Sequence, residues 1–125
     1  MIGFRECVYD EYFLTMLSLA RRVLKAFALA LCLPEDHFES MFHKPIIGMR
    51  LLYYPPQPAV DDEDQLGCGA HTDFDCFTLL SQSDNSGLQV LNMGGKWIDV
   101  PPIPTTFVVN TWCVQKVPGL ILFQN

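Results

Sequence analysis

The first third of the chain has the hydrophobic pattern of a helix. From Asp10 to Leu31 apolar residues recur at intervals of three and four, which gives a helix one hydrophobic face. Pro34 ends this pattern because proline cannot continue a helix, and a shorter helix is predicted from there through His43. The pattern therefore predicts a helical N-terminal region.

After Pro45 the pattern changes to short aliphatic and aromatic runs separated by turn signals. Gly and Asn tolerate positive φ angles, and they predict hairpin turns at 84–87 and 93–96. Prolines, which cannot donate to a sheet ladder, mark joints between strands. The predicted strands are 48–54, 69–72, 76–81, 87–92, 96–100 and 106–110.

A helical front followed by many short strands is typical of an α+β fold in which helices pack on a sandwich, barrel or jelly roll. Half of the 125 residues are hydrophobic and 18% are charged, a balance that can fill a core and argues against disorder. The length fits one small domain or part of a larger one.

The net charge is -6, which argues against nucleic acid or an anionic membrane as a partner. Arg21, Arg22 and Lys25 interrupt the apolar stretch near the N-terminus, so neither a signal peptide nor a membrane span is predicted. The five cysteines are an odd number without a CxxC pair, which predicts free thiols in a reducing compartment. We therefore expect a cytoplasmic location.

The segment His71-Thr72-Asp73 can bind a metal ion. In an extended segment residues i and i+2 share a face, so the imidazole and the carboxylate can converge on one ion. They would be two of the three ligands of the 2-His-1-carboxylate triad of non-haem iron(II) enzymes. The alternative is a histidine at the solvent edge beside a turn aspartate, because a bare HxD is a weak signal.

Further motifs accompany this segment and carry a family resemblance. They are Gly69–Asp73, Phe77–Leu80, Gly87–Val90, Trp97–Pro101 and Phe107–Asn110. Together they resemble the isopenicillin N synthase-like family of iron(II) and 2-oxoglutarate-dependent dioxygenases. The resemblance implies a double-stranded β-helix, a form of jelly roll, braced by N-terminal helices. It also implies an oxidoreductase that uses Fe(II), 2-oxoglutarate and oxygen to hydroxylate or desaturate a small organic molecule.

The resemblance also implies roles for individual residues. His71 and Asp73 match the first two iron ligands and are the expected catalytic residues. Tyr54 matches a tyrosine that helps to hold the 2-oxoglutarate co-substrate, with a core aromatic as the alternative. The residues that could line the substrate pocket, or alternatively pack in the core, are Phe74, Asp75 and Phe77.

The resemblance ends at Asn110. No distal histidine, Gly-Asp turn or RxS arginine follows, and these complete the family's site. We therefore divide the chain into a helical support region (1–44), a partial dioxygenase core (45–110) and an atypical tail (111–125). Whether these residues form an active enzyme stays open. The alternatives are an inactive truncated fragment that pairs with a partner or with itself through exposed strand edges, and a jelly-roll binding module without metal.

Overall fold

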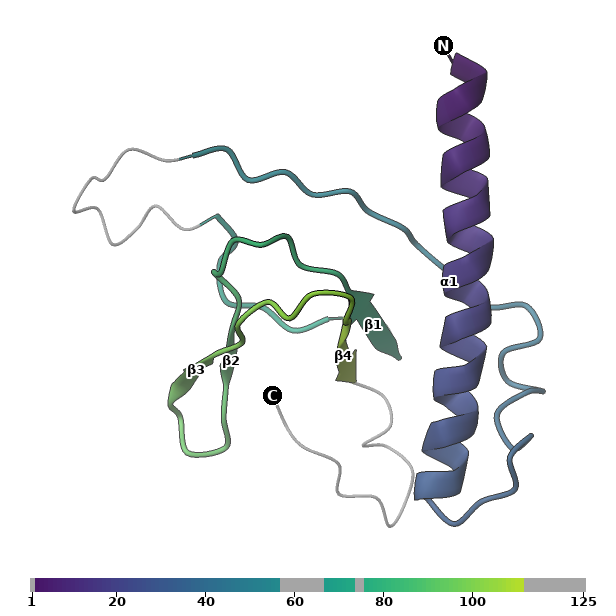
Figure 1. Ribbon diagram of the computed structural model, residues 1–125. Helices are drawn as coiled ribbons and strands as arrows, with labels where there is room; N and C mark the ends of the chain where they lie inside the picture. The colour runs from purple at the N-terminus through teal and green to yellow at the C-terminus, as the bar shows by residue number, and fades with distance from the viewer. Residues whose placement is uncertain (1, 57–66, 74–75, 112–125) are drawn as a thin grey trace. The chain divides into compact units, whose positions relative to one another are not determined.

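The computed structural model describes residues 2–56, 67–73 and 76–111 (Figure 1). The chain divides into two compact units, Met1–Asp61 and Asp62–Asn125, and each is described by itself. In the described residues, the first unit contains one long helix and the second contains four short strands. In the part of the chain that the structure describes, no helix has the length and apolarity needed to cross a membrane.

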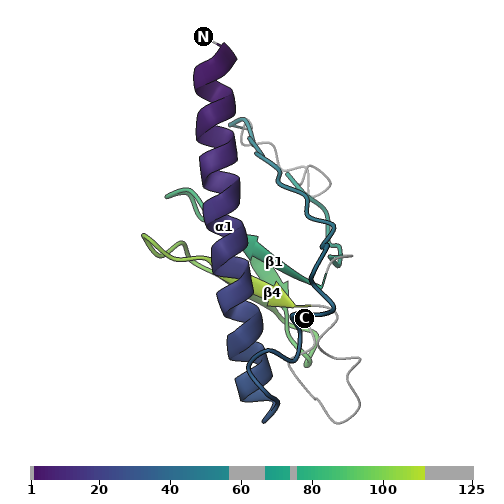
Figure 2. The ribbon, with the colours of Figure 1, turned by 90° about the vertical axis from the view of Figure 1, so that its right-hand side faces the viewer.

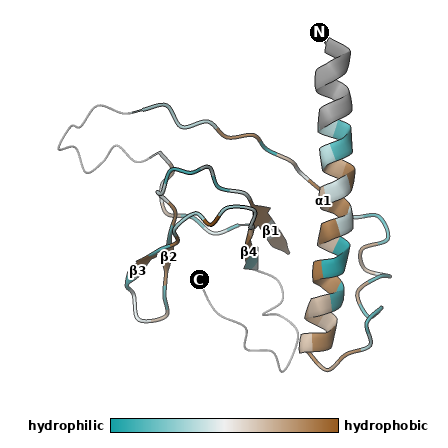
Figure 3. Ribbon diagram, in the orientation of Figure 1, coloured by the Kyte–Doolittle hydropathy of each residue, from teal (hydrophilic) through white to brown (hydrophobic). Residues whose placement is uncertain are grey.

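Helix α1 spans Ile2–Ala30, so the predicted helix is confirmed and begins earlier than its pattern indicated. Beyond the grey first turns, hydrophobic and hydrophilic residues alternate along the helix (Figure 3), consistent with the apolar spacing of three and four. Leu24 and Ala28, one turn apart, are buried together with Phe38 from the segment that follows the helix. The first unit therefore has its small core near the C-terminal end of α1.

The C-terminal end of α1 is closed by a Schellman motif. The Leu33 amide donates to the Ala28 carbonyl at 2.9 Å, and the Cys32 amide donates to the Leu29 carbonyl at 3.0 Å. This motif needs a left-handed residue at the position that Cys32 occupies with a φ of 57°. Pro34 follows directly and prevents the helix from continuing.

Residues 35–42 form turns, so the prediction of a second, shorter helix is wrong. The amides of His37, Glu39 and Met41 each donate to the carbonyl three residues earlier. Such bonds close single turns and do not extend into an α-helical ladder. Lys25 of α1 contacts this segment through Glu35 at 3.2 Å and Glu39 at 3.7 Å, and the hydrogen bond and charge of Glu35 raise the Lys25 pKa.

Within its described residues, 67–73 and 76–111, the second unit contains two antiparallel strand pairs (Figures 1 and 2). Strand β1 (Phe77–Leu80) pairs with β4 (Val108–Thr111), and Thr78 lies opposite Asn110. Strand β2 (Gln89–Leu91) pairs with β3 (Trp97–Asp99). The β1–β4 pair joins segments that lie far apart in the sequence, whereas β2 and β3 form a local hairpin.

The predicted turn at 93–96 is confirmed as the connection between β2 and β3. Gly95 has a φ of 73°, a backbone conformation that glycine adopts at little cost. The Asn92 side chain accepts from the Lys96 amide at 2.9 Å. Across the hairpin the Gln89 carboxamide donates to the Asp99 carboxylate at 2.8 Å.

The predicted strands at 76–81, 87–92, 96–100 and 106–110 are confirmed as β1 to β4. One turn and two further strands are predicted wrongly. Residues 84–87 do not form a hairpin turn, because the strands on either side of them belong to different sheets. Residues 48–54 and 69–72 do not form strands, although their composition favours strands. A strand needs a hydrogen-bonded partner, and in the described residues neither segment has a ladder. One helix and short antiparallel strands fit the expected α+β class; packing of helices on a jelly roll stays a prediction.

A tight turn precedes β4. The amide and hydroxyl of Thr106 donate to the Ile103 carbonyl at 3.3 and 2.8 Å, and Pro104 fixes the first central position. Thr105, at the second central position, has a φ of 62°. A proline followed by a left-handed residue is the backbone of a type II turn, which directs the chain into β4.

Candidate metal site

His71 lies in the segment before β1, with its ring held by a backbone carbonyl. Its Nδ1 is 2.9 Å from the Gly69 carbonyl oxygen and 3.5 Å from the Cys68 sulfur. A carbonyl can only accept, so Nδ1 must carry the proton in this hydrogen bond. In the neutral ring Nε2 then has the free lone pair, which is the tautomer that a metal ligand needs.

Asp73 presents its carboxylate to two partners. One oxygen, Oδ2, accepts a hydrogen bond of 2.8 Å from the side-chain amide of Asn110. The other, Oδ1, is 3.6 Å from Nε2 of His71. The Asp73 side chain is 26% exposed and the His71 side chain is 61% exposed, so the pair can be reached from solvent.

The two donor atoms are close enough to share one ion. Metal–nitrogen and metal–oxygen bonds of about 2.1 Å let a single ion bridge donors up to about 4.2 Å apart, and Nε2 and Oδ1 are 3.6 Å apart. Imidazole and carboxylate suit divalent iron. The alternative, an ion pair between protonated His71 and Asp73, would contribute little at this exposure.

A third protein ligand is missing from the described part of the chain, where no group of three His, Cys, Asp or Glu side chains could hold a metal. Cys68 does not supply it, because its sulfur lies at Nδ1 and not at Nε2. Among the described cysteines, Cys32 and Cys68 are free thiols, as predicted.

Two of the other four predicted site residues, Tyr54 and Phe77, are among the described residues. Tyr54 belongs to the first unit and is 54% exposed. Phe77 is half-buried at the start of β1. Phe74 and Asp75 lie outside the described residues. The structure thus brings together His71 and Asp73, while the roles of the other four stay predictions.

Asn110 was not predicted as part of the site. It ends the run Phe107-Val108-Val109, and a polar residue inside an apolar strand was the signal that could have drawn attention to it. The β1–β4 register places it opposite Thr78, which lies five positions after Asp73. Its contact with Asp73 spans 37 positions of sequence, and no local pattern predicts such a contact.

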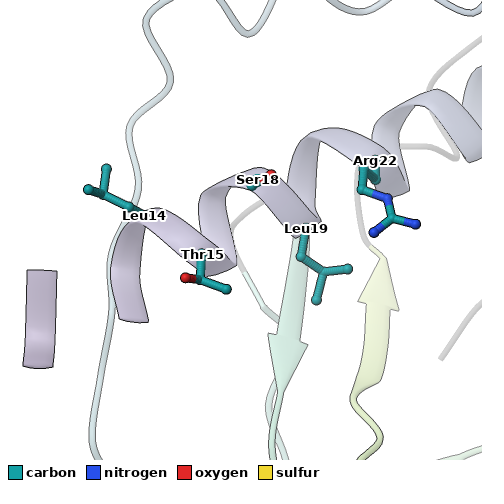
Figure 4. A pocket seen from close by; sticks show the side chains of 5 residues that line it. All are labelled: Leu14, Thr15, Ser18, Leu19 and Arg22. Atoms are coloured by element: carbon teal, nitrogen blue, oxygen red, sulfur yellow. The ribbon is translucent and has the colours of Figure 1, made fainter. Parts of the chain in front are cut away.

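A separate hollow on α1 lacks comparable chemistry. It is lined by Leu14, Thr15, Ser18, Leu19 and Arg22, which lie along one side of the helix (Figure 4). Arg22 is the one charged group in this lining, and it has neither a carboxylate nor an imidazole beside it there. The His71–Asp73 pair is therefore the better candidate for a functional site.

The model of the 2OG-Fe(II) oxygenase superfamily matches residues 47–113, more than half of the chain, and both His71 and Asp73 lie within the match. The chain belongs to this superfamily. Its members use iron(II) and 2-oxoglutarate. The sequence-based resemblance to iron(II) and 2-oxoglutarate-dependent oxygenases is therefore confirmed.

Relatives within the superfamily come from fungi and plants. A 2-oxoglutarate-Fe(II) type oxidoreductase of Aspergillus fumigatus is 43% identical over 106 residues, 84% of this chain and 32% of the relative. The homoarginine-6-hydroxylase 2-ODD-C23 of Glycine max is 40% identical over 126 residues, 96% of this chain and 38% of the relative. The chain thus spans about a third of these relatives' length. No solved structure matches it significantly.

Proposed function

We propose that this chain supplies part of the active site of an Fe(II)- and 2-oxoglutarate-dependent oxygenase that oxidises a small organic molecule. The observation that carries the proposal is the separation of 3.6 Å between Nε2 of His71 and Oδ1 of Asp73. The hydrogen bond between Nδ1 and the Gly69 carbonyl supports it, because it leaves Nε2 available as a ligand.

In this proposal His71 and Asp73 hold the iron and leave coordination positions for 2-oxoglutarate and oxygen. When bound, the iron supplies the redox chemistry that oxidises the substrate while 2-oxoglutarate becomes succinate and carbon dioxide. Tyr54 would contact the co-substrate, and the residues proposed to face the substrate are Phe74, Asp75 and Phe77. Hydroxylation is supported by the plant relatives, which are named hydroxylases.

Succinate formation tests the proposal. The protein containing this chain would be supplied with Fe(II), 2-oxoglutarate and oxygen, and succinate would be measured for the parent and for His71→Ala and Asp73→Ala. We expect each variant to lose succinate formation by more than about 100-fold, because a ligand lost from the metal costs more than the usual effect of its supporting residues.

The matched control is His43→Ala, which removes an exposed histidine of the first unit and should leave succinate formation unchanged. Equal succinate formation by the parent and by His71→Ala would refute the proposal. A parent protein that forms no succinate would instead favour the inactive, partner-binding alternative.

A further inference from the structure

Asn110, on the paired strand β4, contacts one of the proposed metal ligands through its side chain. Its Nδ2 lies 2.8 Å from Oδ2 of Asp73, in a part-buried position. The opposite amide orientation would place two acceptors against each other, so Asn110 donates. A hydrogen bond to an ionised carboxylate is stronger and more directional than one between neutral groups.

The backbone of Asn110 is fixed by the β1–β4 ladder. Its register partner is Thr78, and the neighbouring pairs Leu79↔Val109 and Phe77↔Thr111 lie on either side. The strand pair therefore fixes the backbone from which the Asn110 carboxamide donates to a carboxylate that itself lies in an irregular segment. A group on a paired strand is held more precisely than one on a loop.

We propose that Asn110 is a positioning residue that holds Oδ2 of Asp73 and so leaves Oδ1 alone to face the metal beside Nε2 of His71. Oδ2 is then used for support and Oδ1 for metal binding. Oδ2 accepts from Asn110 at 2.8 Å, and Oδ1 lies 3.6 Å from Nε2 of His71. This inference rests on the proposed metal site.

Titration with Co(II) alone tests the inference on the complete chain. In Asn110→Leu, which keeps the approximate size but has no donor, we expect the Kd for Co(II) to rise by about 10- to 100-fold, the usual effect of losing a group that orients a ligand. The visible absorption of the saturated Co(II) form should also change shape, because Oδ2 is released and can join the coordination. A purely structural role of Asn110 would change the fraction of protein that binds but not this shape.

Gln89→Leu is the matched control. It removes the same type of bond, a carboxamide donating to a carboxylate at 2.8 Å, from the β2–β3 hairpin. We expect it to leave both the Kd and the Co(II) spectrum as in the parent. An Asn110→Leu variant with the parent Kd, or with a weaker Kd and an unchanged spectrum, would overturn the positioning role and leave the metal site standing.

A parent chain that binds no Co(II) would overturn the metal site and the role of Asn110 together. If Asn110→Leu does not fold, the same inference is tested on the parent chain by NMR. On addition of Zn(II), the ¹⁵N NMR signal of the Asn110 carboxamide should shift, while that of Gln89 should not. An Asn110 signal indifferent to Zn(II) would refute the inference.

Discussion

Cys32 occupies a backbone conformation that its side chain disfavours. Its φ of 57° is required by the Schellman motif, in which glycine is the usual residue. A residue with a Cβ atom pays about 1–2 kcal/mol in this region. The side chain is exposed, so burial of the thiol does not offset this strain.

Cys32→Gly is therefore expected to stabilise the first unit by up to about 1 kcal/mol, part of the gain being offset by the greater freedom of glycine in the unfolded chain. Thermal unfolding followed by circular dichroism at the helix band measures this effect. Cys32→Ala is the control, since it removes the thiol but keeps the Cβ atom and should bring no gain. Equal midpoints for the glycine and alanine variants would contradict the explanation.

In both His71 and Asp73, one side-chain atom is hydrogen-bonded to the protein and another is available to bind a metal. Nδ1 of His71 is held by the Gly69 carbonyl, and Oδ2 of Asp73 is held by Asn110. The remaining nitrogen and oxygen are 3.6 Å apart. Each proposed ligand thus has one atom held by the protein and one available, an arrangement that metal sites commonly use.

Among the elements, the β2–β3 hairpin depends on its turn. Asn92 accepts from the Lys96 amide through its side chain, and Gly95 supplies the positive φ of 73°. This local chemistry explains why the sequence predicts the hairpin correctly. The β1–β4 pair has no such local signal, because 27 residues lie between Leu80 and Val108.

Gly95→Ala is predicted to destabilise the hairpin by about 1 kcal/mol, because alanine at positive φ is strained even though open space surrounds the position. Gly87→Ala is the control, since its added Cβ also meets nothing within 4 Å but its φ is not in the strained range. Amide hydrogen exchange at Val90 and Ile98, which pair across the hairpin, reports the change. Equal exchange rates in the two variants would contradict the prediction that the positive φ of Gly95 stabilises the hairpin.

At the scale of the whole chain, the sequence predicts what depends on neighbouring residues. Three features depend only on residues close together in the sequence. They are the hydrophobic pattern of α1, the turn at 93–96 and the proximity of His71 and Asp73. The predicted strand at 48–54 is wrong because composition favours a strand without supplying a partner for it. The Asn110 contact escaped prediction because pairing over a long separation creates it.

The superfamily match agrees with the family resemblance that the sequence motifs indicate. The superfamily match covers 47–113, which includes the motifs on which the sequence-based resemblance depends. The boundaries at 44 and 110 stay predictions. Because the chain spans about a third of its relatives' length, the activity of the whole protein is a proposal that depends on the metal site.

The most direct test of that site is the ¹⁵N NMR spectrum of the histidine side chains during titration with Zn(II), a diamagnetic stand-in for Fe(II). We expect the Nε2 signal of His71 to move as the metal binds, while Nδ1 keeps its proton through the hydrogen bond to Gly69. His37 and His43, both exposed in the first unit, serve as internal controls and should not respond. A His71 signal that stays unchanged, or that moves no more than those of His37 and His43, would contradict the account.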